Sequence, residues 1–456
     1  MEAQVAEKKR TGKVTFVGNP LKISGLLFNH YFPLDLSITK FCFQNCPFCF
    51  ANLNRKATGS VIGKNEDPTD HFIRMLQKAN GPGYNPGNLI EWCLNHKYPV
   101  VFSNNVDPFM PQSEDSHKLG ERVLTECLEH RQPLYIQTKE VFPNEKVKQL
   151  IIQGKDLFQM YVSISTLSYE TAKQYETIAV TPDQRLARIR ELADAGVKVV
   201  VALNPYVPEW QPDLRAYFKA VAESGAKGVM ADPLHFSAAQ KKAASVSRLD
   251  QYIQKSNRYD DFYEDTRIME IAAKENGIFV DYFRRKGDEF AAGANAFDIN
   301  KIGWTMNADR LFQVIHRAYV GEGNNPIMIT WRNVDEFYSQ FPEWKAKFTI
   351  NQFAGPMWTD NQTYFDVKAA LGSRNTMKNV VKYIWNNPDS QAHFFSFFMD
   401  VFRLGDSEGQ DKGEIDDVSD DQGDLIYVYD PEHKDDPVFW DQSDDKLKLK
   451  ELIELQ

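Results

Sequence analysis

Apolar and polar positions alternate in two different rhythms between residues 36 and 282. Short apolar runs bounded by turn residues are typical of buried strands, whereas longer segments with apolar residues three and four apart are typical of helices. The runs predict strands at 36–39, 99–102, 133–138, 161–165, 197–203, 227–230 and 278–282. Helices are predicted between them, near 117–131, 144–153, 181–195, 213–224 and 260–276. This order of about six β/α units predicts an α/β fold with a parallel sheet.

The helix that follows Thr181 has the clearest ends. Thr181 is a typical N-cap residue, Pro182 suits the first helical position, and Gly196 ends the segment. The next residues, 197–203, form the most apolar of the strand candidates. We therefore expect one complete helix–strand unit here.

The pattern changes near residue 291. Six of the eight tryptophans lie beyond residue 300, and apolar runs there have a helical period. We expect most of these aromatic side chains to be core residues rather than platforms for base stacking. The predicted organisation is an N-terminal extension at 1–30, an α/β core at 31–290, a mixed accessory domain at 291–404, and an acidic tail with a short terminal helix at 405–456.

The charge is unevenly distributed. The net charge of −10 at first disfavours a nucleic-acid partner, but residues 405–445 contain 16 acidic and 2 basic residues, which leaves +4 for the rest of the chain. We expect the acidic stretch to be solvated and partly disordered. The alternative is that it imitates a phosphate backbone and covers a basic groove.

Composition predicts a cytoplasmic protein. The hydrophobic content of 42% and charged content of 25% are ordinary for a globular domain. No apolar run approaches 18 residues, and the first ten residues lack the apolar stretch of a secretory signal. Free cysteines suit a reducing compartment. We expect no membrane partner, and the oligomeric state is left open.

Cys42, Cys46 and Cys49 lie within eight residues, spaced C-x3-C-x2-C. Three thiolates on one loop can hold three irons of a 4Fe–4S cube and leave the fourth iron open to a small molecule. A structural zinc site needs four ligands, and the nearest histidines, His30 and His71, are not at a familiar ligand spacing. The remaining alternative is three buried or disulfide-bonded cysteines.

The other two cysteines, Cys93 and Cys127, lie on apolar faces of helical segments. Free cysteine behaves as a small buried hydrophobe, so we expect both in the core. Two thiols are also too few for a second cluster with four thiolate ligands. The chain therefore predicts a single cluster.

The cysteine spacing, with Phe48 just before the last cysteine, resembles the signature loop of the radical S-adenosylmethionine (radical SAM) superfamily. The resemblance implies a partial (β/α)6 TIM-type barrel with its chemistry at the C-terminal strand ends. We expect the accessory domain beyond residue 291 to close the open side of this barrel. It also implies a 4Fe–4S cluster that binds S-adenosylmethionine (SAM). One electron then cleaves SAM to methionine and a 5′-deoxyadenosyl radical, which abstracts a substrate hydrogen. The usual electron donor is a flavodoxin or ferredoxin.

Several segments after the cysteines resemble the spore photoproduct lyase branch of this superfamily more specifically. They are similar to its T-D-P-Y-Q-P, T-K, S-I-S-T and P-x-x-P segments and to one helix–strand unit. The matching residues are 105–111, 137–139, 162–166, 183–199 and 204–208. Together they span roughly residues 35–236, about half of the chain.

The resemblance implies contacts to SAM at the strand ends. Lys139 and Ser165 would meet its carboxylate, a charge-assisted pairing for the lysine. Asn105 and Asp107 would lie near its amino group and ribose, and Asn204 near the adenosyl moiety. The alternatives are an exposed lysine at a helix start for Lys139 and ordinary strand packing for Ser165.

Three further residues complete the expected site. Phe48 would support the adenine. Tyr206 and His235 follow strand ends and would contact the substrate or relay a hydrogen atom, although a structural role fits them as well. Spore photoproduct lyase returns a hydrogen atom through a cysteine after its second strand, and residues 102–106 contain none. Repair of thymine dimers by that route is therefore not expected.

The resemblance favours a nucleobase or nucleotide in DNA as substrate, for modification, isomerisation or repair. The positive charge outside the acidic stretch permits this, although only residues 8–10 and 284–286 form clusters of lysine and arginine. One alternative is a radical SAM enzyme acting on a small metabolite or peptide. Another is a non-enzymatic iron–sulfur sensor or electron carrier.

Overall fold

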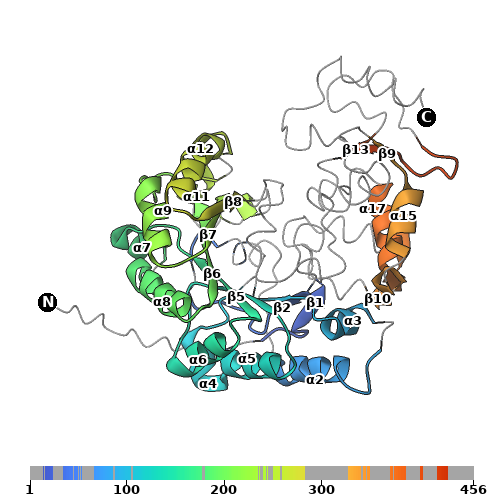
Figure 1. The fold of residues 1–456 in the computed structure, drawn as a ribbon, viewed down its shortest axis with the longest axis horizontal. Helices are drawn as coiled ribbons and strands as arrows, with labels where there is room; N and C mark the ends of the chain where they lie inside the picture. The colour runs from blue at the N-terminus through green and yellow to red at the C-terminus, as the bar shows by residue number, and fades with distance from the viewer. Residues whose placement is uncertain are drawn as a thin grey trace, which may run out of the picture. The chain divides into compact units, whose positions relative to one another are not determined.

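The computed structural model divides into two compact units (Figure 1). Unit 1 consists of Met1–Ile23, Phe32–Tyr84 and Cys93–Asp298, and unit 2 of the remaining residues. Each unit is described by itself. The residues that the structure describes are 14, 16–23, 34–44, 46–49, 51, 53, 66–85, 88–103, 106–176, 180–234, 236, 240–242, 244, 250–256, 259–282, 327–339, 342–345, 347–349, 370–372, 374–386, 401–403 and 419–429.

Unit 1 is built on one eight-stranded sheet whose strands follow one another in chain order. Strands β2 to β8 run parallel, and β1 pairs antiparallel with β2. Within the described residues no pairing joins β8 to β1, so the sheet is open. This confirms the predicted parallel α/β fold and partial barrel. The strands are β1 (Leu21–Ile23), β2 (Leu34–Leu36), β3 (Val100–Phe102), β4 (Leu134–Thr138), β5 (Phe158–Ser163), β6 (Lys198–Tyr206), β7 (Gly228–Pro233) and β8 (Phe279–Tyr282).

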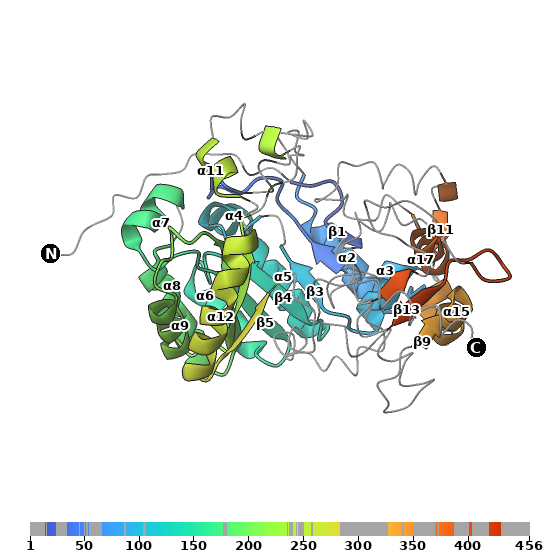
Figure 2. The ribbon, with the colours of Figure 1, turned by 90° about the horizontal axis from the view of Figure 1, so that it is seen from above.

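Most helices of unit 1 lie along the outer side of the curved sheet (Figures 1 and 2). Helices α9 and α12 are side by side in both views and contact each other. The helices of unit 1 are α2 (Thr69–Ala79), α4 (Pro111–His117), α5 (Leu119–Glu129), α6 (Glu145–Gln153), α7 (Tyr169–Tyr175), α8 (Pro182–Asp194), α9 (Leu214–Glu223), α11 (Asp250–Gln254) and α12 (Tyr259–Glu275). Helix α3 (Leu89–Asn95) is divided between the two units after Trp92.

Helix α8 begins as predicted. The Thr181 side chain accepts from the backbone N–H of Gln184, and the Gln184 side chain accepts from the backbone N–H of Thr181, which forms a capping box. After the helix, Gly196 adopts φ +88°, a conformation that favours glycine. The predicted cap and stop signals are therefore confirmed at both ends.

Two predicted elements differ from the structure. The expected helix at 117–131 is α5 (Leu119–Glu129), which begins two residues later than predicted because Lys118 adopts a left-handed φ of 50°; the short helix α4 before it was not predicted. The first parallel strand is Leu34–Leu36 rather than 36–39. Asp35 lies in the middle of that strand and is only 4% exposed. An acidic residue interrupts the apolar run, so the apolar pattern does not indicate a strand at these positions.

The two faces of the sheet differ in character. Phe102 packs edge-on against Phe109, whose ring lies beside Gly120 of α5, so the Phe102 face is directed toward the helices. The strand register pairs Val101 with Tyr135, and Tyr135 with Gln159. Val101 directly precedes Phe102, so this row of residues lies on the opposite face of the sheet from Phe102. The polar side chains of Tyr135 and Gln159 therefore lie on the inner side of the sheet, away from the helices.

Unit 2 contains a three-stranded antiparallel sheet, a two-stranded sheet and short helices. Its elements are β9 (Ile327–Ile329), α15 (Trp331–Ser339), η1 (Pro342–Lys345), β10 (Lys347–Thr349), β11 (Arg374–Thr376), α17 (Met377–Trp385), β12 (Val401–Arg403) and β13 (Tyr427–Tyr429). Trp331 packs with Trp344 and Trp385, with ring centroids 5.9 and 6.1 Å apart. These three tryptophans are core residues, as expected.

Part of the predicted acidic tail is incorporated into unit 2. Strand β13 pairs with both β12 and β9, and the buried Asp424 accepts from Lys382 at 2.8 Å and Asn386 at 2.7 Å. The negative charge at this point is thus matched by Lys382 of α17 and by Asn386, which directly follows that helix. The terminal helix expected within 405–456 lies outside the described residues. Along the described ranges, no helix is both long and apolar enough to cross a lipid bilayer.

Candidate functional site

The three neighbouring cysteines lie on a loop beyond the carboxyl end of β2. Their thiols are free; Cys46 is buried, and Cys42 and Cys49 are partly exposed. The backbone N–H of Cys49 donates to the carbonyl of Cys46 at 3.1 Å, which closes a tight turn. The loop also contacts the segment between β3 and α4, because Phe43 donates from its backbone to the Met110 sulfur at 3.0 Å.

Burial opposes ionisation of two of the thiols, those of Cys42 and Cys46. Burial, and then the Asp107 carboxylate, raise the pKa of Cys42 to about 11. Burial also raises the pKa of Cys46 well above its ordinary value; the Lys139 ammonium opposes this rise, and Glu176 and the other two cysteines add to it. Thiolates at these positions need cationic charge beside them, which iron supplies.

The described residues contain no ready-made site for a single metal ion. Across the described residues, no three His, Cys, Asp or Glu side chains gather as ligands of one ion would. A cube distributes its thiolate ligands over separate irons, so three thiols spaced along one loop suit it. Cys42, Cys46 and Cys49 are the residues that would hold such a cluster, and this assignment stays a prediction.

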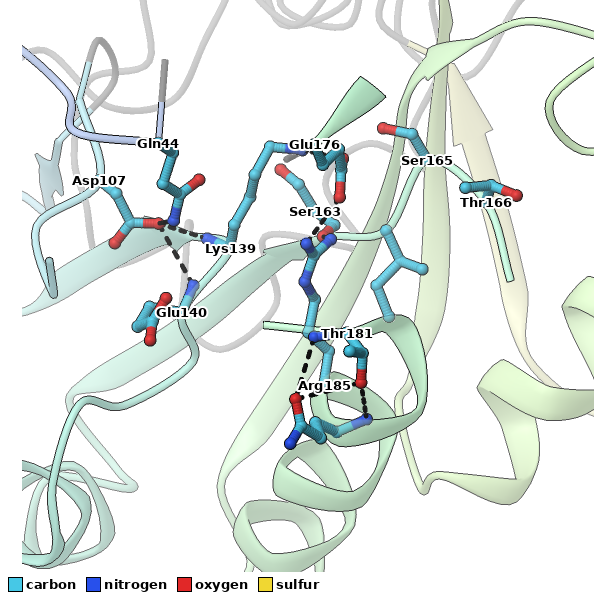
Figure 3. A network of polar contacts seen from close by, with 12 residues as sticks. Gln44, Asp107, Lys139, Glu140, Ser163, Ser165, Thr166, Glu176, Thr181 and Arg185 are labelled. Carbon is cyan, nitrogen blue, oxygen red and sulfur yellow. Dashed lines mark hydrogen bonds and ion pairs between the residues drawn. The ribbon is translucent and has the colours of Figure 1, made fainter. Parts of the chain in front are cut away.

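Asp107 connects the cysteine loop to the end of β4 (Figure 3). Its side chain is buried and accepts five hydrogen bonds of 2.6 to 3.2 Å, from Gln44 Nε2, Phe109 N, Thr138 Oγ1, Lys139 N and Glu140 N. Burial raises the pKa of Asp107, although these donors oppose the shift. The carboxylate joins two of the segments singled out in the sequence, 105–111 and 137–139. Its predicted contact to SAM stays a prediction.

Lys139 belongs to a buried chain of charges (Figure 3). Its ammonium forms an ion pair with Oε1 of Glu176, whose Oε2 lies 2.6 Å from Nη2 of Arg185. Arg185 Nη1 also donates to the carbonyl of Ser163 at 2.8 Å. The side chains of Arg185 and Glu176 are 1% and 2% exposed, whereas that of Lys139 is 15% exposed. Lys139 is therefore not the exposed helix-start lysine of the alternative interpretation.

Glu176 is ionised in this setting. Burial by itself would raise its pKa, but the charges of Arg185 and Lys139 and their hydrogen bonds outweigh it and lower the pKa of Glu176 to about 2. Two cations thus share one carboxylate, and the group carries one net positive charge beside the cysteine loop.

Ser165 and Asn204 lie next to each other at the ends of β5 and β6. Ser165 is 1% exposed, and its hydroxyl donates to the backbone carbonyl of Asn204 at 3.3 Å. The Tyr206 hydroxyl donates to Asp265 of α12 at 2.7 Å. A contact of Tyr206 with substrate stays a prediction, because its hydroxyl here is directed to a helix of the outer layer.

Two predicted residues, Asn105 and His235, lie outside the described residues. Phe48, predicted to support adenine, is 5% exposed and packs against Trp210 and Tyr252, with centroids 5.1 and 6.3 Å apart. Cys46 belongs to the same apolar cluster. The Lys139 ammonium lies 5.7 Å from the Phe48 ring centroid, so the aromatic and charged groups meet beside the loop.

Sequence reasoning missed Glu176, Arg185 and Trp210. A signal for Arg185 was present, because it falls on the same helical face as Ile189 and Leu192, which are both buried. An arginine on the apolar face of a helix requires a buried acceptor. The sequence did not indicate which of the many acidic residues would supply it.

Comparisons with known proteins add the following. No family model matches the chain. The uncharacterized protein ORF301 of Acidianus two-tailed virus is 26% identical over 208 residues, which cover 42% of this chain and 64% of the viral protein.

Two solved structures are similar over about half of the chain. Spore photoproduct lyase complexed with dinucleoside spore photoproduct has a TM-score of 0.38 and 14% identity, covering 52% of this chain and 72% of that one. Streptococcus suis SuiB bound to S-adenosylmethionine has a TM-score of 0.32 and 13% identity, covering 53% of this chain and 44% of that one. At these values neither likeness assigns a family to the chain.

Proposed function

We propose that this protein is a radical SAM enzyme with a single 4Fe–4S cluster on Cys42, Cys46 and Cys49. The observation that carries the proposal is the set of three free thiols on one loop at the carboxyl end of a parallel sheet. The loop is anchored by Gln44 and Asp107 to the end of β4, where Lys139 lies. This edge is where α/β enzymes place their chemistry.

When bound, the cluster would supply the electron that cleaves SAM to methionine and a 5′-deoxyadenosyl radical. The residues of the chain would hold and orient the cofactor. Lys139 and Ser165 would bind the carboxylate of SAM, Asn105 would lie near its amino group, and Asn204 near the adenosyl moiety. The packed ring of Phe48 would keep water from the loop.

The proposed substrate is a nucleobase in DNA, which the radical would attack by abstracting a hydrogen atom. Two lines support this choice. The segments similar to spore photoproduct lyase include 105–111 and 137–139, which meet through Asp107. The chain outside the acidic stretch also carries net positive charge, which suits a polyanion.

The test is an anaerobic assay of 5′-deoxyadenosine with the reconstituted, chemically reduced protein. The reaction is run with and without double-stranded or single-stranded DNA carrying deuterium on the bases. Cys42→Ala removes a proposed ligand, and Cys127→Ala is the matched control, since Cys127 is fully buried on α5. We expect DNA-stimulated product containing deuterium from wild type and Cys127→Ala, and none from Cys42→Ala.

The other outcomes separate the alternatives. Product that forms at the same rate without DNA and contains no deuterium would overturn the nucleobase proposal and favour a small metabolite or peptide. A loaded cluster that never cleaves SAM would overturn the enzymatic proposal and favour an iron–sulfur sensor or electron carrier.

A further inference from the structure

We infer that Glu176 is a positioning residue for SAM, acting by fixing the Lys139 ammonium where the SAM carboxylate binds. The inference rests on the proposed function. Glu176 is the C-cap residue of α7 and is not part of any motif that pointed to the site. It would act on the cofactor only through Lys139.

The geometry gives Glu176 a fixed place. Its Oε2 lies 2.6 Å from Nη2 of Arg185, and Arg185 is itself held by the Ser163 carbonyl at 2.8 Å. Ser163 ends β5, and Arg185 belongs to the capped helix α8. The carboxylate is thus fixed by two regular elements, and it presents its other oxygen, Oε1, to Lys139.

Lys139 is the adjustable member of the group. Its backbone N–H is fixed on Asp107, but a lysine side chain has four rotatable bonds, and this one retains 15% of its exposure. Glu176 selects the orientation in which the ammonium lies 5.7 Å from the Phe48 ring centroid, beside the cysteine loop. Holding the ammonium there in advance reduces the entropy lost when a carboxylate binds to it.

Charge determines what happens when Glu176 is neutralised. Lys139 and Arg185 would then be two cations without a counter-ion, and they would repel each other in a region of low dielectric. Arg185, 1% exposed, has no path to water, whereas Lys139 has one. The lysine would therefore turn toward solvent, and the carboxylate of SAM would lose its partner.

The experiment compares two ligands bound to the oxidised, cluster-loaded protein by anaerobic titration calorimetry. SAM carries the carboxylate, whereas 5′-methylthioadenosine has the same nucleoside without it. We expect Glu176→Gln to weaken SAM binding by roughly tenfold, the cost of immobilising one long side chain, and to leave 5′-methylthioadenosine unchanged. Glu275→Gln, which removes the exposed partner of Arg215, should change neither affinity.

A double-mutant cycle tests whether the effect passes through Lys139. In a Lys139→Met background, Glu176→Gln should cause no further loss of SAM affinity. If Glu176→Gln does not fold, Glu176→Gln with Arg185→Met removes both buried charges, a change that folds often tolerate. The same selective loss of SAM affinity is expected of that variant.

The outcomes are distinct. Unchanged or tighter SAM binding, or an equal loss for both ligands, would overturn the positioning role. A further loss in the Lys139→Met background would do the same. Wild-type protein that binds neither ligand would instead refute the proposed function itself.

Discussion

Glu176 is a buried carboxylate between two cations, and its replacement by glutamine should destabilise unit 1 strongly. Arg185 would remain 1% exposed without its counter-ion. Breaking a buried ion pair by removing one partner costs roughly 3–5 kcal/mol, because an uncompensated charge stays behind. We therefore expect a loss of unfolding free energy of about that size for Glu176→Gln.

The chain offers a matched control for the same chemistry at the surface. Arg215 and Glu275 lie 2.6 Å apart, but their side chains are 59% and 49% exposed. Exposed pairs contribute about 0–1 kcal/mol, since water solvates whichever partner remains. Glu275→Gln should therefore change the stability by less than about 1 kcal/mol.

The assay should report on unit 1 alone, because the two units need not unfold together. Cys127 is fully buried on α5, so its alkylation during a urea titration, quantified by mass spectrometry, follows the unfolding of this unit. The midpoint should shift to lower urea for Glu176→Gln and stay in place for Glu275→Gln. Equal midpoints for the two variants would refute the assignment of Glu176 to a buried, ionised network.

Three further outcomes are expected. Gly228→Ala should destabilise unit 1 by roughly 1–3 kcal/mol in the same labelling assay, because a Cβ would lie 2.5 Å from the Phe279 ring; an unchanged urea midpoint would contradict this close approach. The pKa of Glu176 is lowered from 4.5 to about 2, so its contribution to stability is complete above pH 4.5 and is lost as the pH falls toward 2. The urea midpoint of the wild type should therefore fall more steeply over that pH range than the midpoint of Glu176→Gln. Parallel pH profiles of the two midpoints would contradict the lowered pKa of Glu176. Asp424→Ala should make unit 2 more sensitive to limited proteolysis, since it removes two partly buried hydrogen bonds. Substitution of the exposed Asp421 by alanine should not, and equal cleavage rates for the two variants would show that the acidic segment is not needed for that unit.

Much of the fold follows from patterns that are local in sequence. A strand such as 197–203 and the capped helix before it are set by neighbouring residues, and both form as predicted. The first parallel strand was misplaced because Asp35 interrupts its apolar run. The break at Lys118 depends on a left-handed backbone that a lysine does not signal.

The candidate site also has one part that neighbouring residues indicate and one part that only the folded chain brings together. Three thiols in eight residues are visible to any reader of the sequence, because the ligands are contiguous. The network of Lys139, Glu176 and Arg185 joins residues up to 46 positions apart, and only the folded sheet brings them together. The sequence could indicate that Arg185 needs a buried acceptor, but not which carboxylate supplies it.

The central claim is that three cysteines of this chain hold a cluster that cleaves SAM. The most direct measurement is the yield of 5′-deoxyadenosine and methionine from anaerobically reconstituted, reduced protein. We expect the two products in equal amounts from wild type and from Cys93→Ala, which removes a fully buried thiol of α3, and neither from Cys42→Ala. Wild-type protein with a full complement of iron and sulfide that forms neither product would contradict the account.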